Sequence, residues 1–216
     1  ELGVPFSDPT ADGPTIEAAS RRALSRGMTV AGALAIVRKF RRTHGTPVVL
    51  FGYYNPFLRY GIPKLVRDAR RAGVDGFLVV DLPLEEAGDA VPAMRAAGLD
   101  WIPLAAPTSG MTRIREFDRA GSGFLYLVSV TGVTGTRKSL PRGLAAWARD
   151  VRRAVKLPVA VGFGISTPRM AHEATRHADA AVVGSACVKI VARHGEDPRG
   201  PAELSRFVRS LKSALR

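Results

Sequence analysis

The stretch GFLVVD at residues 76–81 decides the fold, because four consecutive apolar side chains leave neither face of this short segment for water. A second stretch of the same kind, PVAV, stands at residues 158–161. Strands that are apolar on both faces are typical of a parallel sheet covered by helices. The two stretches therefore predict an α/β domain with a buried parallel sheet.

Further apolar runs of strand length lie on either side of these two stretches. Together they predict seven strands, at residues 1–6, 48–54, 76–81, 100–106, 123–130, 159–164 and 180–186. The intervening segments have helical spacing, as in Ile62, Leu65, Val66, Ala69 and Ala72, and glycines such as Gly73 and Gly98 stand where a helix ends. Strand and helix alternate without a linker, which predicts one domain over residues 1–216.

Two architectures share this alternation, an open doubly wound sheet and a closed (β/α)8 barrel. An open sheet that binds a dinucleotide places a G-x-G-x-x-G turn after its first strand, whereas residues 5–9 read PFSDP. An eight-unit barrel takes ~250 residues, so seven units need about 219. The chain has 216 residues. We therefore expect a (β/α)8 TIM barrel that is incomplete at the N-terminus and lacks its first strand and helix.

Composition limits the class of protein. With 46% apolar and 24% charged residues and one cysteine, Cys187, the chain is expected to be globular, without a disulfide framework, and cytoplasmic. The net charge of +13 raises nucleic-acid binding as an alternative function. However, the basic residues are dispersed in pairs such as 21–22, 70–71 and 152–153, which favours solvated helix faces over a binding footprint.

Glycines follow the last two predicted strands. Gly162 and Gly164 stand at the carboxyl end of the first of these strands, and Gly184 and Ser185 at that of the second. Many barrels bind phosphate at these two loops, where glycine lets backbone N–H groups approach the anion. The pattern predicts a phosphate site, although glycines also simply terminate strands.

Two acidic residues are candidates for acid–base chemistry at the opposite end of the chain. Glu1 lies within the first predicted strand, where burial raises the pKa of a carboxyl group, and Asp12 lies in the Pro/Gly-rich loop that follows. No lysine falls within a predicted strand, which argues against an imine mechanism, and the four histidines fall in or beside helices, which argues against a metal site. We expect metal-free catalysis by carboxylates on a phosphorylated substrate.

Several segments carry a specific resemblance. They are ELGVPFSDPTADGPTI at residues 1–16, YYNP at 53–56, DLPLEE at 81–86, APTS at 106–109, YLVSVTGVTG at 126–135, GFGIS at 162–166 and GSA at 184–186. In this order they closely resemble the tryptophan synthase alpha chain family, and the similarity spans the whole chain.

This resemblance implies a lyase of tryptophan biosynthesis that cleaves indole-3-glycerol phosphate to indole and D-glyceraldehyde 3-phosphate, with no cofactor or metal in this chain. Glu1 would be the proton-transfer group. Asp12 would stabilise positive charge on the indole nitrogen while the ring carbon is protonated.

The resemblance also implies a set of substrate-binding residues. Tyr126 and Thr134 would line the site, with Thr134 in a lid at residues 131–142 that reaches Asp12. Tyr53 and Leu78 would enclose the indole, although ordinary barrel packing explains them equally well. The phosphate would be held by Gly135, Phe163, Gly164, Gly184 and Ser185.

A partner is implied as well. The family works with a beta chain that holds pyridoxal phosphate, in an α2β2 heterotetramer, and the residues that resemble its contact surface are Pro5, Asp8, Asn55 and Pro56.

A missing first βα unit would remove one wall of the indole pocket and leave two unpaired sheet edges, so low activity is expected. The alternatives are a silent subunit that only binds or activates a beta chain, and another phosphate-binding barrel enzyme.

Overall fold

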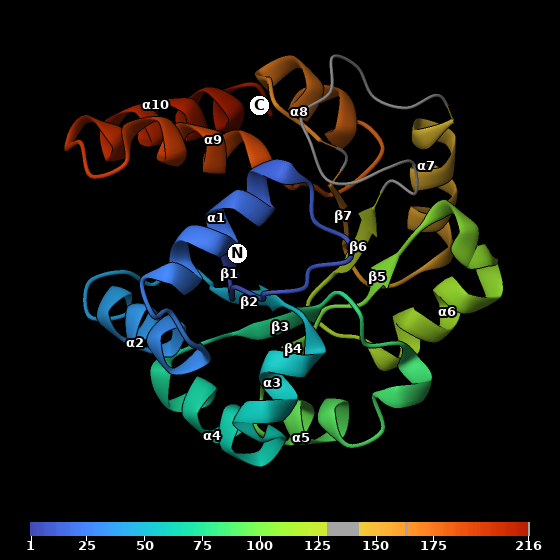
Figure 1. Cartoon of the computed structure of the whole chain (residues 1–216). Helices are drawn as coiled ribbons and strands as arrows, with labels where there is room; N and C mark the ends of the chain where they lie inside the picture. Colours follow the sequence, from blue (N-terminus) through green and yellow to red (C-terminus); the bar gives the residue numbers. More distant parts are fainter. Residues whose placement is uncertain (129–142, 163, 216) are drawn as a thin grey trace.

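The computed structural model describes residues 1–128, 143–162 and 164–215, and its strands form two four-stranded parallel sheets in sequential order, β1-β2-β3-β4 and β5-β6-β7-β8. The strands surround a common centre (Figure 1). Their bounds are β1 Leu2–Gly3, β2 Val49–Gly52, β3 Gly76–Val79, β4 Asp100–Trp101, β5 Leu104–Ala105, β6 Leu125–Val128, β7 Val159–Gly162 and β8 Ala180–Ala181.

Strands β4 and β5 connect the two sheets, because only two residues separate them. The N–H group of Ile102 donates to the carbonyl of Phe77 beside β4, at 2.8 Å, and the carbonyl of Pro103 accepts from the N–H group of Tyr126 on β6, at 2.9 Å. Proline has no N–H group for a ladder. The single strand predicted at residues 100–106 is therefore wrong in detail: this segment forms two short strands and changes partner at Pro103.

The observed strands are also shorter than predicted at their carboxyl ends. In β1 the last rung is the hydrogen bond from the Val4 N–H group to the carbonyl of Phe51, at 2.8 Å, and Pro5 follows without an N–H group to donate. At the other end of the chain, the strand predicted at 180–186 is present but shorter, because β8 ends at Ala181 and Ser185 begins a helix. The residues beyond each strand enter loops at the rim of the barrel.

Helices cover the outside of the strands (Figure 1). The five residues predicted as the apolar face of one helix are all buried in α4, and Gly73 ends that helix in the left-handed conformation with φ of 88°. The bounds are α1 Pro14–Ser25, α2 Val30–Phe40, α3 Tyr54–Tyr60, α4 Ile62–Ala72, α5 Ala90–Ala96, α6 Gly110–Ala120, α7 Leu144–Ala154, α8 Pro168–Thr175, α9 Ser185–His194 and α10 Arg199–Ser213, with short 3-10 turns at η1 Leu84–Glu86 and η2 Pro107–Ser109.

The strand side chains separate into two apolar clusters, one on each face of the barrel wall. Leu50 and Phe77 belong to the large outer cluster under the helices, whereas Leu78, Ile102 and Tyr126 form a small inner cluster. Alternate residues of β3 thus point in opposite directions, as the pleat requires. This two-sided burial is what the stretch at residues 76–81 predicts.

The arginine pairs at 21–22, 70–71 and 152–153 are exposed on helices, as expected. Arg41 differs, because its guanidinium donates to the carbonyl of Gly73 at 2.7 Å and pairs with Asp75, fastening the end of α2 to the turn before β3. Among the described residues, no helix has the length and apolar character needed to cross a bilayer.

Asp118 of α6 joins its helix to the segment that enters β7. One carboxylate oxygen accepts from the N–H groups of Lys156 at 2.9 Å and Leu157 at 2.8 Å. We expect Asp118→Ala to lower the free energy of unfolding by about 1–3 kcal/mol, because two N–H groups lose a charged acceptor. Chemical denaturation measures this, with the exposed Glu173→Ala as control. An Asp118 variant as stable as the control contradicts the assignment.

Candidate active site

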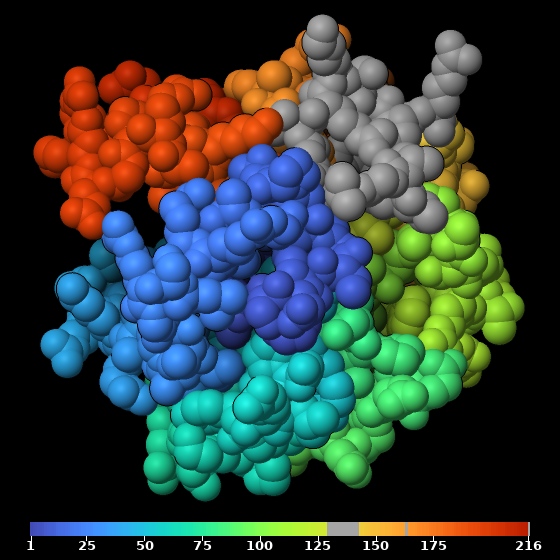
Figure 2. Space-filling view, viewed as in Figure 1, coloured from blue at the N-terminus to red at the C-terminus, as the bar shows by residue number. Residues whose placement is uncertain are grey.

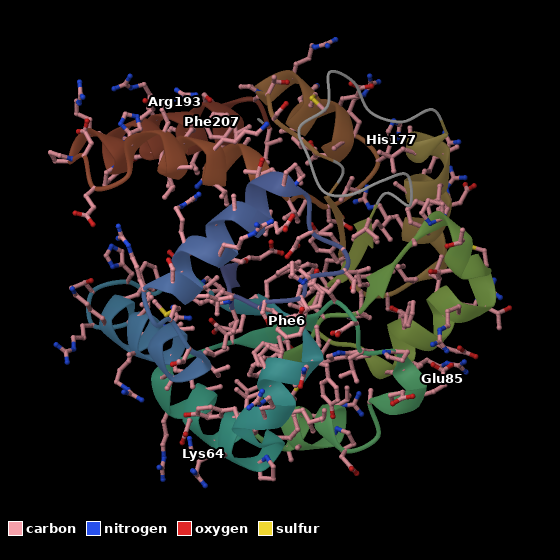
Figure 3. All side chains as sticks on the ribbon, in the orientation of Figure 1. Phe6, Lys64, Glu85, His177, Arg193 and Phe207 are labelled. Atoms are coloured by element: carbon pink, nitrogen blue, oxygen red, sulfur yellow. The ribbon has the colours of Figure 1, made fainter. Side chains whose placement is uncertain are left out.

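The candidate site lies at the carboxyl ends of the strands, where the N-terminal segment crosses the barrel. The darkest blue atoms, which belong to this segment, occupy the middle of the face in Figure 2. Phe6 lies centrally in Figure 3, whereas Lys64, Glu85 and Arg193 lie toward the periphery. The two predicted catalytic carboxylates are the ends of this central segment.

Glu1 was predicted to lie within the first strand, but it directly precedes β1. Leu2 and Val4 pack in the outer cluster, so alternation along the segment directs Glu1 to the barrel interior. The residue retains exposed surface, but the surrounding protein desolvates its carboxyl group and raises the pKa of Glu1, an effect partly opposed by the adjacent α-amino charge. A carboxyl group in this environment holds its proton to higher pH than a solvated one.

Tyr126 on β6 faces the same interior. Burial raises the pKa of its hydroxyl, and the negative charge of Glu1 raises this pKa further. A Cβ atom on Gly162 would lie 2.1 Å from the Tyr126 hydroxyl oxygen. Gly162, predicted as a phosphate residue, thus has a packing role that the sequence did not indicate: it gives the tyrosine ring room against β7.

Asp12 is fastened to the mouth of the barrel by Tyr53. The Tyr53 hydroxyl accepts from the N–H group of Ala11 at 3.0 Å, and its ring packs against Phe6 with centroids 5.4 Å apart. Burial raises the pKa of Asp12, the hydrogen bond with Tyr53 lowers it, and the charge of Glu17 raises it. The segment is therefore held at two places, through the pairing of β1 with β2 and through Tyr53, which follows β2 and caps the start of α3. Glu1 faces the barrel interior, and Asp12 lies at the mouth beside Tyr53.

Tyr53 caps the start of α3 instead of ending a strand, which corrects the predicted strand at 48–54. It is 3% exposed. Beside it, Asp81 follows β3 and accepts from the N–H group of Tyr54 at 2.6 Å. This carboxylate holds the first turn of α3 in place, and with it the ring that supports Asp12.

The loops after β7 and β8 lie side by side, because Val161 pairs with Ala181 in register. Gly164 has φ of 68°, a conformation that favours glycine. Gly184 precedes α9, and Ser185 is the first residue of that helix and is buried. The N–H groups of a first helical turn have no intrahelical acceptor, so this corner offers donors to an anion.

The structure describes only some of the remaining predicted site residues. Thr134, Gly135, Phe163 and the lid at 131–142 lie outside the described residues. Leu78 is fully buried in the inner cluster, which agrees equally with packing and with an indole wall. Across the described ranges, no three His, Cys, Asp or Glu side chains gather as a metal site would require.

The Tyr53 hydroxyl gives a direct test of the electrostatics at Asp12. A hydrogen bond to the charged carboxylate favours that form, so Tyr53→Phe is expected to raise the pKa of Asp12 above its already raised value. Carbon-detected NMR titration of the Asp12 carboxyl group measures this shift. Tyr54→Phe is the control, since only the backbone of Tyr54 is bonded to Asp81. A fall in the Asp12 pKa contradicts the assigned contact.

Comparison with known proteins agrees with this geometry. The tryptophan synthase alpha chain from Citrifermentans bemidjiense is 50% identical over 215 residues, which are 100% of this chain and 80% of that protein. The tryptophan synthase alpha chain from Solibacter usitatus is 50% identical over 212 residues, covering 98% and 79%. The prediction that this chain lacks a first βα unit stays a prediction.

Solved structures give the same result for the fold. A tryptophan synthase alpha chain from Legionella pneumophila superposes with a TM-score of 0.89 at 36% identity, covering 99% of this chain and 79% of that one. A tryptophan synthase complex from Pyrococcus furiosus gives 0.90 at 38% identity, covering 98% and 85%. The predicted TIM barrel is thereby confirmed. Since the family model described as "Tryptophan synthase alpha chain" also matches residues 1–216, this chain belongs to the tryptophan synthase alpha chain family.

Proposed function

We propose that this chain cleaves indole-3-glycerol phosphate to indole and D-glyceraldehyde 3-phosphate, as a lyase of tryptophan biosynthesis. One observation carries the proposal: the N-terminal segment bears two carboxyl groups with raised pKa, Glu1 facing the barrel interior and Asp12 beside Tyr53 at the mouth. Acid–base catalysis needs groups whose pKa lies near the working pH.

Glu1 performs the proton transfers in this proposal. In its protonated form it donates to the indole ring carbon that carries the glyceryl chain, and the bond between them then breaks. The electron pair of that bond restores the aromatic ring, and the carboxylate of Glu1 takes the proton of the glyceryl hydroxyl as this becomes the aldehyde. No oxidant or reductant is required, and Glu1 ends the cycle protonated as it began.

Asp12 stabilises the intermediate. Protonation of the ring carbon leaves positive charge on the indole nitrogen, and a carboxylate near the N–H group lowers the energy of that cation. The hydrogen bond with Tyr53 supports this role because it favours the charged form of Asp12. In this proposal Glu1 begins the cycle protonated, whereas Asp12 acts as a carboxylate.

The proposed substrate contacts lie along the inner wall and the rim of the barrel. Leu78, Tyr53 and Tyr126 enclose the indole, and the phosphate binds at Gly164, Gly184 and Ser185, beside Gly162. The N-terminus of α9 supports this position, since helix N-termini favour anions. Thr134, Gly135 and Phe163 complete the proposed set.

We further propose that the chain assembles with a beta chain in an α2β2 heterotetramer, in the cytoplasm, with pyridoxal phosphate on the beta chain. Asp8 and Asn55 are exposed near the mouth and are available for such a contact. Pro5 is buried, so its accessibility does not support its predicted place on the contact surface. Sedimentation of the mixed chains tests the assembly.

The decisive experiment incubates the chain with indole-3-glycerol phosphate, alone and with a beta chain, and measures indole and D-glyceraldehyde 3-phosphate. Equal amounts of the two products support the proposal. Stimulation of the beta chain without either product supports the silent-subunit alternative instead.

A further inference from the structure

A further acidic residue, Glu17, lies on the first turn of α1, a short distance along the chain from Asp12. The helix begins at Pro14, and Gly13 is its N-cap. Asp12 therefore occupies the position before the cap, and Glu17 is the fourth residue of the helix. Side chains at these two positions commonly pack against each other, usually as an apolar pair that fixes how the chain enters the helix. Here both positions carry an acid, so the same geometry brings two like charges together.

Hydrogen bonds on both sides of Asp12 fix its place relative to α1. On one side, the carbonyl of Gly13 accepts from the Glu17 N–H group at 3.0 Å. On the other side, the N–H group of Ala11 donates to the Tyr53 hydroxyl at 3.0 Å. Asp12 is half-buried, and the Glu17 side chain is 38% exposed. Charges at partly buried positions are screened less than charges in open solvent, so each carboxylate is expected to sense the other.

The charge of Glu17 acts on Asp12 in addition to the effects of burial and of Tyr53. Burial is the largest cause of the raised pKa of Asp12, and the Tyr53 hydrogen bond opposes it. The negative charge of Glu17 raises the pKa of Asp12 further. A carboxylate of higher pKa is a stronger acceptor for a cationic N–H group, as long as it stays deprotonated.

Arg21 limits the effect of Glu17. Its guanidinium pairs with the Glu17 carboxylate one turn further along α1, in the i,i+4 arrangement with the acid on the N-terminal side. This is the favourable orientation of such a pair on a helix. The positive charge offsets part of the negative charge of Glu17, and so helps Asp12 to remain a carboxylate.

Helix α9 packs against α1 and brings further basic residues near (Figure 1). Arg193 and His194 both pair with Glu203 of α10, at 3.0 Å and 2.5 Å. Lys189 is the third basic residue of α9 and is exposed. Because the first two are engaged with another acid, Lys189 is the residue of α9 that a test has to include.

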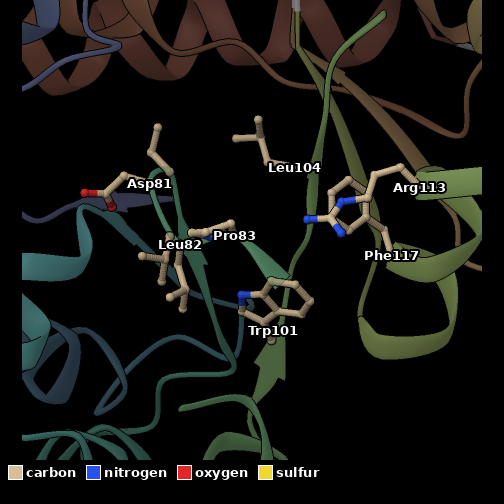
Figure 4. Close-up of a pocket in the computed structure, with 9 residues that line it drawn as sticks. Asp81, Leu82, Pro83, Trp101, Leu104, Arg113 and Phe117 are labelled. Atoms are coloured by element: carbon tan, nitrogen blue, oxygen red, sulfur yellow. The ribbon is translucent and has the colours of Figure 1, made fainter. Parts of the chain in front are cut away.

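On the other side of Tyr53, Asp81 is the next carboxylate of the rim. It accepts from the Tyr54 N–H group at 2.6 Å, and in Figure 4 its carboxylate points away from Arg113. Arg113 itself pairs with Glu85. Neither of these charges is paired with Glu17, whose partner is the arginine on its own helix.

We propose that Glu17, held by Arg21, is a positioning residue that acts on the reaction through Asp12. It makes the Asp12 carboxylate a stronger partner for the indole N–H group, while Arg21 prevents the two acids from losing a charge. The role of Asp12 in this inference rests on the proposed function, whereas the interaction of Glu17 with Asp12 does not.

Carbon-detected NMR titration of the Asp12 carboxyl group tests the interaction without any assay of activity. Glu17→Gln is expected to lower the pKa of Asp12 and Arg21→Gln to raise it, each by about 0.3–0.6 pH unit, the scale of one charge pair in largely solvated surroundings. Arg22→Gln removes the same charge from an exposed neighbouring position of α1 and is the matched control. Its effect on the Asp12 pKa, like that of Lys189→Gln, is expected to be smaller than that of Arg21→Gln.

The opposite signs are decisive, because a general disturbance of α1 would move the Asp12 pKa in the same direction in both variants. Shifts of the same sign, an unmoved pKa in Glu17→Gln, or an Arg21 variant that behaves like the Arg22 control overturns the proposal. A larger shift in Lys189→Gln than in Arg21→Gln also overturns it, since the compensating charge would then belong to α9.

The pH profile of indole release connects the interaction to the reaction. Asp12 acts as a carboxylate, so activity is lost as pH falls through its pKa. Glu17→Gln is expected to move this acid limb to lower pH and Arg21→Gln to higher pH, by the shifts that NMR measures. Opposite NMR shifts in a chain that releases no indole overturn the proposed function but retain the interaction. Indole release with an unmoved Asp12 titration overturns this inference alone.

Discussion

Replacing Glu1 with Gln is expected to lower kcat for indole release by about 100-fold to 10,000-fold, the usual contribution of a general acid–base group. Glutamine keeps the size of the side chain but neither donates nor accepts the transferred proton. KM for indole-3-glycerol phosphate is expected to change little, because the proposed phosphate contacts at Gly164, Gly184 and Ser185 remain. Steady-state assay of indole formation measures both quantities.

The pH dependence sharpens this prediction. Burial raises the pKa of Glu1, so its protonated form persists to a higher pH than that of a solvated glutamate, and the proton donation it performs is lost as pH rises through that raised value. The Gln variant loses this limb of the profile. Glu173→Gln, an exposed residue of α8, serves as control. A Glu1 variant with more than a tenth of the wild-type kcat contradicts the assigned role.

Gly162→Ala is expected to be the most damaging single methyl addition. The new Cβ would lie 2.1 Å from the hydroxyl oxygen of Tyr126 and 2.5 Å from its Cζ atom, so the ring must move. Overpacking of this kind costs about 1–3 kcal/mol of unfolding free energy. Because the ring lies beside Glu1 in the barrel interior, kcat/KM is also expected to fall about 100-fold through misplaced contacts.

Denaturation and steady-state kinetics on the same preparation measure both effects. Gly88→Ala is the matched control, since a Cβ there meets no atom within 4 Å. Combining Gly162→Ala with Tyr126→Phe removes the closest contact and is expected to restore part of the lost stability. A single variant as stable and active as the Gly88 control shows that the close approach has no consequence.

Sequence periodicity predicts much of this fold, because burial on two faces leaves a clear pattern. Phe77 and Leu78 read as consecutive apolar residues, and the structure places one under the helices and the other inside the barrel. The apolar face of α4 is likewise complete in the sequence. In both cases the signal is local, since a strand or helix of fixed period exposes its faces at fixed spacing.

Contacts between distant segments were not predictable in this way. Nothing near Pro103 indicates that its strand changes partner, because that depends on the position of Phe77 and Tyr126. The fit between Gly162 and Tyr126 and the pairing of Arg113 with Glu85 are equally non-local. These features arise from packing between elements, which no single segment encodes.

The candidate site falls between these cases. Glu1 was singled out as a carboxylate within the first predicted strand, and Asp12 by its place in the loop that follows, because parallel strands direct such loops to one rim. The role of Tyr53 as a support needed the structure, since its hydroxyl reaches Ala11 across 42 residues of sequence. The lid residues lie outside the described part of the chain, and their roles stay predictions.

The alternation along the first four residues restricts how this segment can diverge in evolution. Glu1 faces the chamber only because Leu2 and Val4 are anchored on the other side of the wall. The gain or loss of one codon between Glu1 and Val4 would turn the Glu1 side chain toward the helices and an apolar side chain toward the barrel interior. Point substitutions at Leu2 are therefore far more tolerable than any insertion or deletion there, and homologous chains should align without gaps across these four positions.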